Sequence, residues 1–195
     1  CHAPRDDISD CEDLLRSGTY RGFMWLMSIL SITGNVFCLI FRTVVNKKST
    51  KNAFNLFVSC LSLADLLMGV YITIIGSADL VFRGVYLNVD TSWMKSVACQ
   101  AAGFLSLVSS EVSAVSILFI TIDRFITLRF PFSRFRLERR AAVCVCGFAW
   151  VFGLVLATIP LLPLTSHWEF YGQTGICVPL PITRNDFEGQ SYSFG

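Results

Sequence analysis

The sequence is poor in charge and in histidine. Only 15% of its 195 residues are charged, and the only histidines are His2 and His167. The formal net charge is +2, and no lysine or arginine run alternates with aromatic residues, so nothing favours a nucleic-acid partner. Hydrophobic residues make up 53% and the mean hydropathy is +0.58, unlike a soluble globular domain. We therefore expect an integral membrane protein in contact with lipid.

The scarcity of histidine also argues against an enzyme. Both histidines lie in polar stretches, so no apolar segment contains a serine–histidine or histidine–metal arrangement. Cys144 and Cys146 form a C-x-C pair, but a metal site needs two further ligands nearby, so apolar packing is the expected role. We expect no catalysis and no bound metal of this kind.

The sequence opens with Cys1, without an initiator methionine, and shows no signal peptide. We therefore expect a fragment of a longer protein. Residues 1–22 are polar and acid-leaning and are interpreted as a linker outside the membrane. Residues 189–195 are interpreted as the first turns of a further, truncated segment.

Between these ends, over residues 23–188, we expect four membrane-spanning helices. Each apolar segment is long enough to cross a bilayer. Basic residues crowd the first and third connections, which places these connections in the cytoplasm and the N-terminus outside. Gly34, in the first segment, is expected to allow a close helix approach. The four segments are Phe23–Phe41, Ala53–Ile75, Cys99 to about Ile126, and Ala141–Leu164. The predicted fold is an all-α membrane helix bundle.

The third segment organises the rest. From Cys99 to Arg124 a helix would measure roughly 37 Å, slightly more than a hydrocarbon core of about 30 Å. Asp123 and Arg124 would then lie at the inner end, where the acid could hold the arginine or release it to a partner, as a switch requires. Pro131 and Phe132 follow, beside a basic loop where a protein partner could dock.

Two acids lie inside apolar segments. A carboxylate there costs about 2.5 to 3.5 kcal/mol, so Asp65 needs a reason. It is either a polar or cation-binding point, partnered by Asn35 and by serines such as Ser106 or Ser110, or a structural hydrogen-bonding acid. For Glu111, structural packing is the preferred interpretation.

The cysteines fall into two groups. Cys99 and Cys177 both lie on the predicted outer side, where an oxidising exterior would join them, although two free thiols are the alternative. A bridge would hold the loop after the fourth segment across the outer opening. Cys1 and Cys11 are also external and could pair with each other or with cysteines upstream. Those inside apolar runs are expected to be free thiols.

In order and spacing these features resemble the first four helices of a rhodopsin-like G-protein-coupled receptor. The matching features are Gly34-Asn35, the LSLAD stretch ending at Asp65, Trp93, Cys99, Asp123-Arg124-Phe125, Trp150, Pro160 and Cys177. The resemblance implies a network of sodium and water around Asp65 and Asn35, with a possible sodium ion at Asp65. It also implies that Arg124 is the switch facing a heterotrimeric G protein and that Phe132 contacts that protein.

The flanking stretches are similar to the leucine-rich-repeat hormone receptors, first to the relaxin-receptor branch and then to the glycoprotein-hormone receptors. They include CEDLL from Cys11, FRGVY from Phe82, SEVS from Ser110 and GICVPL from Gly175. This resemblance implies a peptide or protein hormone as ligand, the plasma membrane as location, and an upstream ectodomain bonded to Cys1 and Cys11. Phe125 departs from the family, which commonly has an aromatic hydroxyl there, and neither leucine-rich repeats nor helices five to seven are present.

Three alternatives remain. The acids inside the segments permit an ion transporter or channel, although paired repeats and half-helices are missing. A membrane-embedded hydrolase lacks its catalytic group. The chain could also be a truncated, non-signalling isoform that pairs with the complete receptor.

Overall fold

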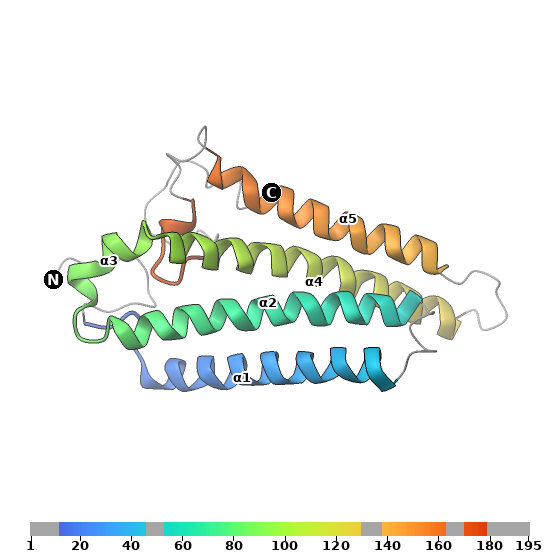
Figure 1. Ribbon diagram of the computed structural model, residues 1–195, viewed down its shortest axis with the longest axis horizontal. Helices are drawn as coiled ribbons and strands as arrows, with labels where there is room; N and C mark the ends of the chain where they lie inside the picture. The colour runs from blue at the N-terminus through green and yellow to red at the C-terminus, as the bar shows by residue number, and fades with distance from the viewer. Residues whose placement is uncertain (1–11, 46–52, 130–137, 163–169, 179–195) are drawn as a thin grey trace.

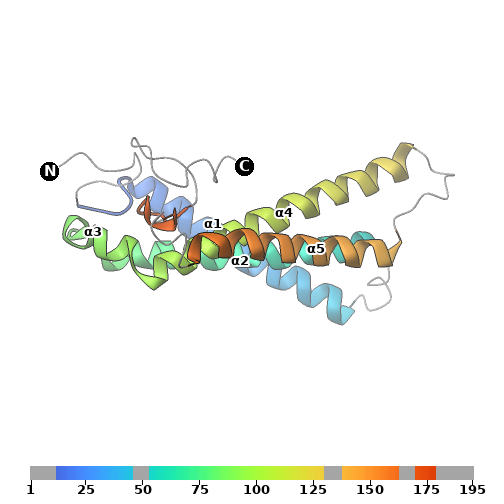
Figure 2. The same cartoon turned by 90° about the horizontal axis from the view of Figure 1, so that it is seen from above.

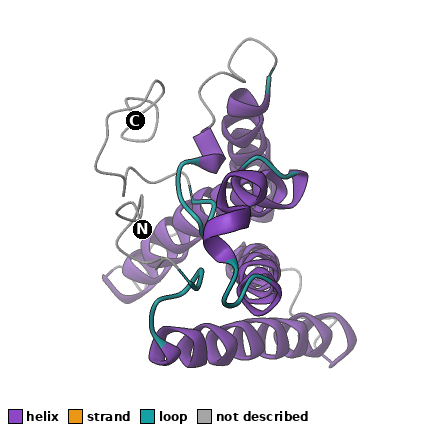
Figure 3. Ribbon diagram, turned by 90° about the vertical axis from the view of Figure 1, so that its left-hand side faces the viewer, coloured by secondary structure: helices purple, strands orange, loops and turns teal. Residues whose placement is uncertain are grey.

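The computed structural model describes residues 12–45, 53–129, 138–162 and 170–178. All regular structure in these ranges is helical (Figure 3). The long helices are α1 (Gly18–Ile40), α2 (Ala53–Val81), α4 (Val97–Arg129) and α5 (Arg139–Thr158). Shorter elements are α3 (Tyr86–Met94), a π-helical turn (Phe41–Val45) and 3-10 turns at Ile159–Leu161 and Phe170–Gly172.

Four helical stretches are long and apolar enough to cross a membrane: Gly18–Val44, Ala53–Val81, Val97–Arg129 and Arg139–Leu161. The predictions of an all-α bundle and of four spans are confirmed. Pro160, which has no backbone N–H, lies in the 3-10 turn that follows α5.

Helix α2 is the hub of the bundle and contacts α1, α4 and α5 (Figure 1). Helix α2 finishes and α4 begins beside α3 and Phe170–Gly172, and we call this the disulfide end. At the opposite end α2 and α5 begin and α1 and α4 finish, and we call this the Arg124 end. Helices α1 and α4 diverge toward the Arg124 end (Figure 2).

Helix α1 lies at the edge of the bundle, since Ser28 is its only buried residue. It packs tightly against α2 at Gly69, where an added Cβ would lie 2.8 Å from Ile32 Cγ1. A Cβ at Gly34 would meet nothing within 4 Å. Among the described helices no close approach is found at Gly34, because the small residue at the contact between α1 and α2 belongs to α2 and Gly34 is turned away from it.

The stretch between the second and third predicted segments, from Asp79 to Lys95, is mostly helical. Helix α2 continues to Val81, which includes Asp79, and Tyr86–Met94 forms α3. Helix α1 also begins earlier than the predicted segment, at Gly18, where the Ser17 hydroxyl accepts a hydrogen bond from the Thr19 N–H at 3.3 Å. Both extensions bring charged residues into the helical bundle, and these residues meet at the disulfide end.

Candidate functional site

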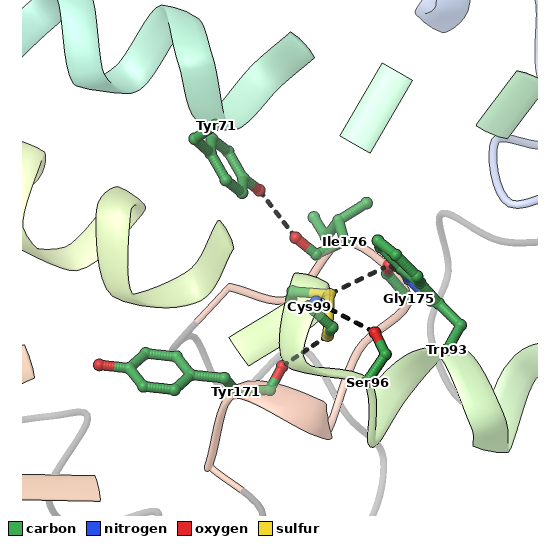
Figure 4. Close-up of a disulfide and its surroundings, with 8 residues drawn as sticks. Tyr71, Trp93, Ser96, Cys99, Tyr171, Gly175 and Ile176 are labelled. Carbon is green, nitrogen blue, oxygen red and sulfur yellow. Dashed lines mark hydrogen bonds between the residues drawn. A yellow bond between two sulfur atoms is a disulfide. The ribbon is translucent and has the colours of Figure 1, made fainter. Parts of the chain in front are cut away.

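The Cys99–Cys177 disulfide joins the start of α4 to the segment after Phe170–Gly172 (Figure 4). The two Cα atoms are 5.4 Å apart and both residues are fully buried. The sequence left open whether these thiols were free or joined, and the structure joins them. The bridge fixes the loop after α5 to the first turn of the long helix α4.

Hydrogen bonds between side chains and backbone carbonyls also hold this loop against the bundle. The Tyr71 hydroxyl donates to the Ile176 carbonyl at 2.8 Å, and Trp93 Nε1–H donates to the Gly175 carbonyl at 2.8 Å (Figure 4). The Tyr171 hydroxyl donates to the Ala157 carbonyl of α5 at 2.8 Å. The loop is therefore bonded to α2, α3 and α5 in addition to the disulfide on α4.

Gly103 gives the loop room to lie against α4. A Cβ at this position would come within 2.3 Å of the Tyr171 ring and 2.6 Å of the Cys177 carbonyl oxygen. Any side chain would therefore push the loop away. The sequence alone assigned no role to Gly103, and the structure supplies a physical one.

The chain just before α1 packs into the same end. Leu14 is fully buried and Leu15 is 2% exposed, and Leu14 belongs to the apolar cluster that also contains Tyr71, Trp93 and Cys177. The Tyr86 N–H donates to the Glu12 carbonyl at 3.4 Å. Residues 12–15, within the stretch interpreted as a linker outside the membrane, therefore pack against the bundle.

An ion pair that sequence reasoning missed anchors this segment. The fully buried Asp79 carboxylate pairs with Arg21 and accepts the Leu15 N–H at 3.0 Å. Arg21 also pairs with Asp13 at 3.3 Å, and Asp13 accepts the Gly84 N–H at 3.0 Å. One arginine thus pairs with two acids, and each acid also accepts one backbone N–H. Burial of a charge is costly unless it is paired, so the pair explains how Asp79 can lie inside α2.

Asp65 receives a hydroxyl from α4, as expected, but from a different serine. Ser113 Oγ donates to Asp65 Oδ1 at 3.0 Å. The expected partner Ser106 is buried two helical turns nearer the disulfide end, where its carbonyl accepts the Ser110 hydroxyl at 2.8 Å. Because α2 and α4 run in opposite directions, the depth of Asp65 matches Ser113 and not Ser106.

Asn35 is connected to Asp65 only through another residue. Its Nδ2 donates to the Ser31 carbonyl in its own helix at 2.8 Å, and Ser31 Oγ donates to the Asp65 backbone carbonyl at 2.7 Å. The amide therefore finds its partner within α1.

Glu111 is half-buried and lies beside Gly153 of α5. A Cβ added to Gly153 would be 3.5 Å from the Glu111 Cβ, which agrees with a packing position for Glu111 between α4 and α5.

At the Arg124 end the expected ion pair is not formed. Within the described ranges no salt bridge joins Asp123 to Arg124, and the Asp123 backbone carbonyl accepts the Thr127 hydroxyl at 2.8 Å. Arg124 instead places its guanidinium carbon 3.5 Å from the centre of the Phe54 ring of α2. Neighbouring residues on a helix point in different directions, so adjacency in sequence did not produce a contact.

Other predicted residues of this end are exposed or lie outside the described ranges. The Phe125 side chain is 63% exposed. Arg42 donates to Asn55 Oδ1 at 2.8 Å, which links the end of α1 to the start of α2. Pro131 and Phe132 lie outside the described residues, as do Cys1 and Cys11 at the other end of the chain.

Comparison with known proteins gives a consistent result. The sequence model of the family described as "7 transmembrane receptor (rhodopsin family)" matches residues 34–194. The chain is 38% identical over 195 residues to the G-protein coupled receptor GRL101 of Lymnaea stagnalis, covering 100% of this chain and 17% of that receptor. It is 34% identical over 196 residues to relaxin receptor 2 of Homo sapiens, covering 100% of this chain and 26% of that receptor.

A further relative is the follicle-stimulating hormone receptor of Cairina moschata, 33% identical over 184 residues, with 93% of this chain and 26% of that receptor covered. The chain thus spans 17% to 26% of the length of these relatives.

Proposed function

Because the chain belongs to the rhodopsin family of seven-transmembrane receptors, we propose that it is part of a receptor carrying a hormone signal across the plasma membrane. The ligand is an extracellular peptide or protein hormone, relaxin-like or glycoprotein-hormone-like, and the partner inside is a heterotrimeric G protein. The family consists of receptors and not of enzymes. The similarity to relaxin receptor 2 and to a follicle-stimulating hormone receptor supports the hormone class.

The observation that carries this proposal is the placement of two features on one helix. The 33-residue helix α4 holds the loop-binding Cys99 at one end and the exposed Arg124 at the other. At about 1.5 Å per residue such a helix exceeds a bilayer core of about 30 Å. Movement at the disulfide end can therefore reach the opposite face of the membrane through a single rigid element.

Charge supports the orientation. Arg42 lies beside the start of α2, Arg139 is the first residue of α5 and Arg140 is the second. All three lie at the Arg124 end. Basic residues favour the cytoplasmic side. The N-terminus and the disulfide end then face outward. An epitope inserted before residue 12 should bind antibody on intact cells; binding only after permeabilisation would reverse the orientation.

The decisive experiment begins with the transcript on both sides of this chain. We expect leucine-rich repeats upstream and three further spans downstream. The complete receptor is then expressed with G-protein energy-transfer sensors and exposed to relaxin-family peptides and glycoprotein hormones. Activation by one hormone class supports the proposal. Normal surface expression without any activation contradicts it, and a stop codon shortly after Gly195 would support a truncated isoform instead.

A matched pair of variants tests the inner site. Arg124→Ala should reduce activation strongly at unchanged surface expression, because it removes the proposed G-protein contact. Arg139→Ala removes an exposed arginine from the same end and should have a smaller effect. Equal losses would show that general positive charge, and not Arg124, supports coupling.

The polar group around Asp65 also fits a sodium ion. Hard cations bind carboxylate and hydroxyl oxygens. The Asp65 carboxylate oxygen Oδ1 and the Ser113 hydroxyl oxygen Oγ lie 3.0 Å from each other. These two residues would hold the ion, which would supply positive charge beside the half-buried carboxylate. Replacing sodium by potassium should change hormone affinity in the unmodified receptor but not in Asp65→Asn. Equal sodium sensitivity in both would exclude the site.

A further inference from the structure

The Arg124 guanidinium rests on an aromatic ring. Its Cζ atom lies 3.5 Å from the centre of the Phe54 ring. A cation within about 6 Å of a ring face is attracted by the electron-rich face. Phe54 is the second residue of α2, and Arg124 lies near the end of α4, so the contact joins two helices at the Arg124 end.

No acid restrains the guanidinium in the part of the chain that the structure describes. The recorded salt bridges there belong to Arg21, and none involves Asp123. Arg124 is exposed while Phe54 is half-buried. The ring is therefore a fixed surface within the bundle, and the arginine is the part that can leave it.

We propose that the Phe54 ring is the resting platform of Arg124 and restrains its guanidinium until the G protein engages it. This inference rests on the proposed function, in which Arg124 is the residue that the G protein meets. Phe54 is a positioning residue, because it acts through Arg124. A cation–π contact at an exposed site favours the resting position by about two- to fivefold, so a protein partner can overcome it readily.

Fluorination tests the electronic part of the contact while leaving the ring nearly unchanged in size. Each fluorine withdraws electrons from the ring face and weakens its attraction for a cation. Mono-, di- and trifluorinated phenylalanine are introduced at position 54 of the complete receptor, and hormone-independent G-protein activation is measured at equal surface expression. We expect activation to rise stepwise, by about two- to fivefold across the series.

Phe119 provides the matched control. Its ring stacks on Phe57 with centroids 5.7 Å apart, and among the described residues the cation–π contact belongs to Phe54 and not to Phe119. The same fluorinated series at Phe119 should leave hormone-independent activation nearly unchanged. A similar rise at both positions would overturn the inference, because it would reflect general loosening of the packing.

The remaining outcomes are also decisive. A flat series at Phe54, in a receptor that hormone activates, overturns the inference and leaves the proposed function intact. A falling series overturns it as well, since the ring would then hold the coupled state. If hormone activates nothing, the proposed function fails first, and with it the restraint.

The contact itself has a separate readout that does not depend on signalling. Fluorine NMR of the complete receptor in lipid nanodiscs, with fluorinated phenylalanine at position 54, should show a changed chemical shift on Arg124→Gln and a smaller change on Arg124→Lys, which keeps the cation. No change on Arg124→Gln would overturn the platform.

Discussion

The two ends of the bundle are held in different ways. At the disulfide end Cys99, Cys177 and Asp79 are fully buried, and the chain before α1, helix α3 and the loop after α5 converge on one cluster. At the Arg124 end helices α1 and α4 diverge (Figure 2), and Leu128 is 82% exposed. The polar side chains there make exposed or half-buried contacts, Arg42 to Asn55 and Arg124 to Phe54, above an apolar cluster that includes Phe57.

This difference separates fixed from adjustable structure. A buried ion pair or disulfide is expensive to disturb, whereas an exposed hydrogen bond or cation–π contact is worth about 1 kcal/mol or less. A receptor needs a defined surface where ligand arrives and a surface that can rearrange where its partner docks. We therefore expect substitutions at the disulfide end to lower the stability of the chain more than substitutions at the Arg124 end, as measured by thermal unfolding in lipid nanodiscs.

The largest effect is expected from Asp79→Ala. It leaves the Arg21 guanidinium without its buried partner and the Leu15 N–H without its acceptor. Loss of one member of a buried pair costs about 3–5 kcal/mol. Glu138→Ala, at an exposed acid with no side-chain capping bond, is the control and should be nearly neutral. Equal stability of the two variants would contradict the buried pair.

The next effect is the loss of the disulfide. Cys99→Ser or Cys177→Ser should cost about 2–4 kcal/mol, because the unfolded chain regains the freedom that the bridge removes. The double variant should cost no more than either single one, since the same bond is lost. In the complete receptor both single variants should reduce surface expression or hormone response. Full expression and response in both would show that the bridge is dispensable.

Gly103→Ala should have an intermediate effect. The new Cβ would overlap the Tyr171 ring and the Cys177 carbonyl, so the loop must shift. Overpacking of this kind costs about 1–3 kcal/mol. Gly147→Ala is the matched control, because a Cβ there meets nothing within 4 Å and alanine is the better helix former. If Gly103→Ala is as stable as Gly147→Ala, the loop does not lie against α4 as described.

The sequence predicted the four spans well because hydropathy is a local property that each segment carries alone. Cys99 and Cys177 were also identified, since both fall on one predicted side of the membrane. Arg21 and Asp79 were not, because charges near the ends of apolar segments are ordinarily solvated. Their pairing across 58 residues depends on how α1 and α2 pack.

Helix rotation explains the other differences. Gly34 and Gly69 look alike in sequence, yet only Gly69 faces the neighbouring helix. Asp65 was correctly expected to meet a serine of α4, but the register of two antiparallel helices selected Ser113 over Ser106. For Arg124, the adjacent Asp123 was the obvious partner, and the aromatic ring across the helix interface could not be identified without coordinates.

The smallest effect on stability is expected at Asp123. Its side chain is half-exposed and forms no salt bridge to a described residue, so Asp123→Asn should change the free energy of unfolding by less than about 0.5 kcal/mol. This outcome would distinguish the two ends of the bundle, because loss of the carboxylate at Asp79 breaks a buried ion pair. A loss above about 1 kcal/mol that disappears in an Arg124→Gln background would instead reveal an ion pair between the neighbours. The Arg124 end would then be held by charge as well as by the Phe54 ring.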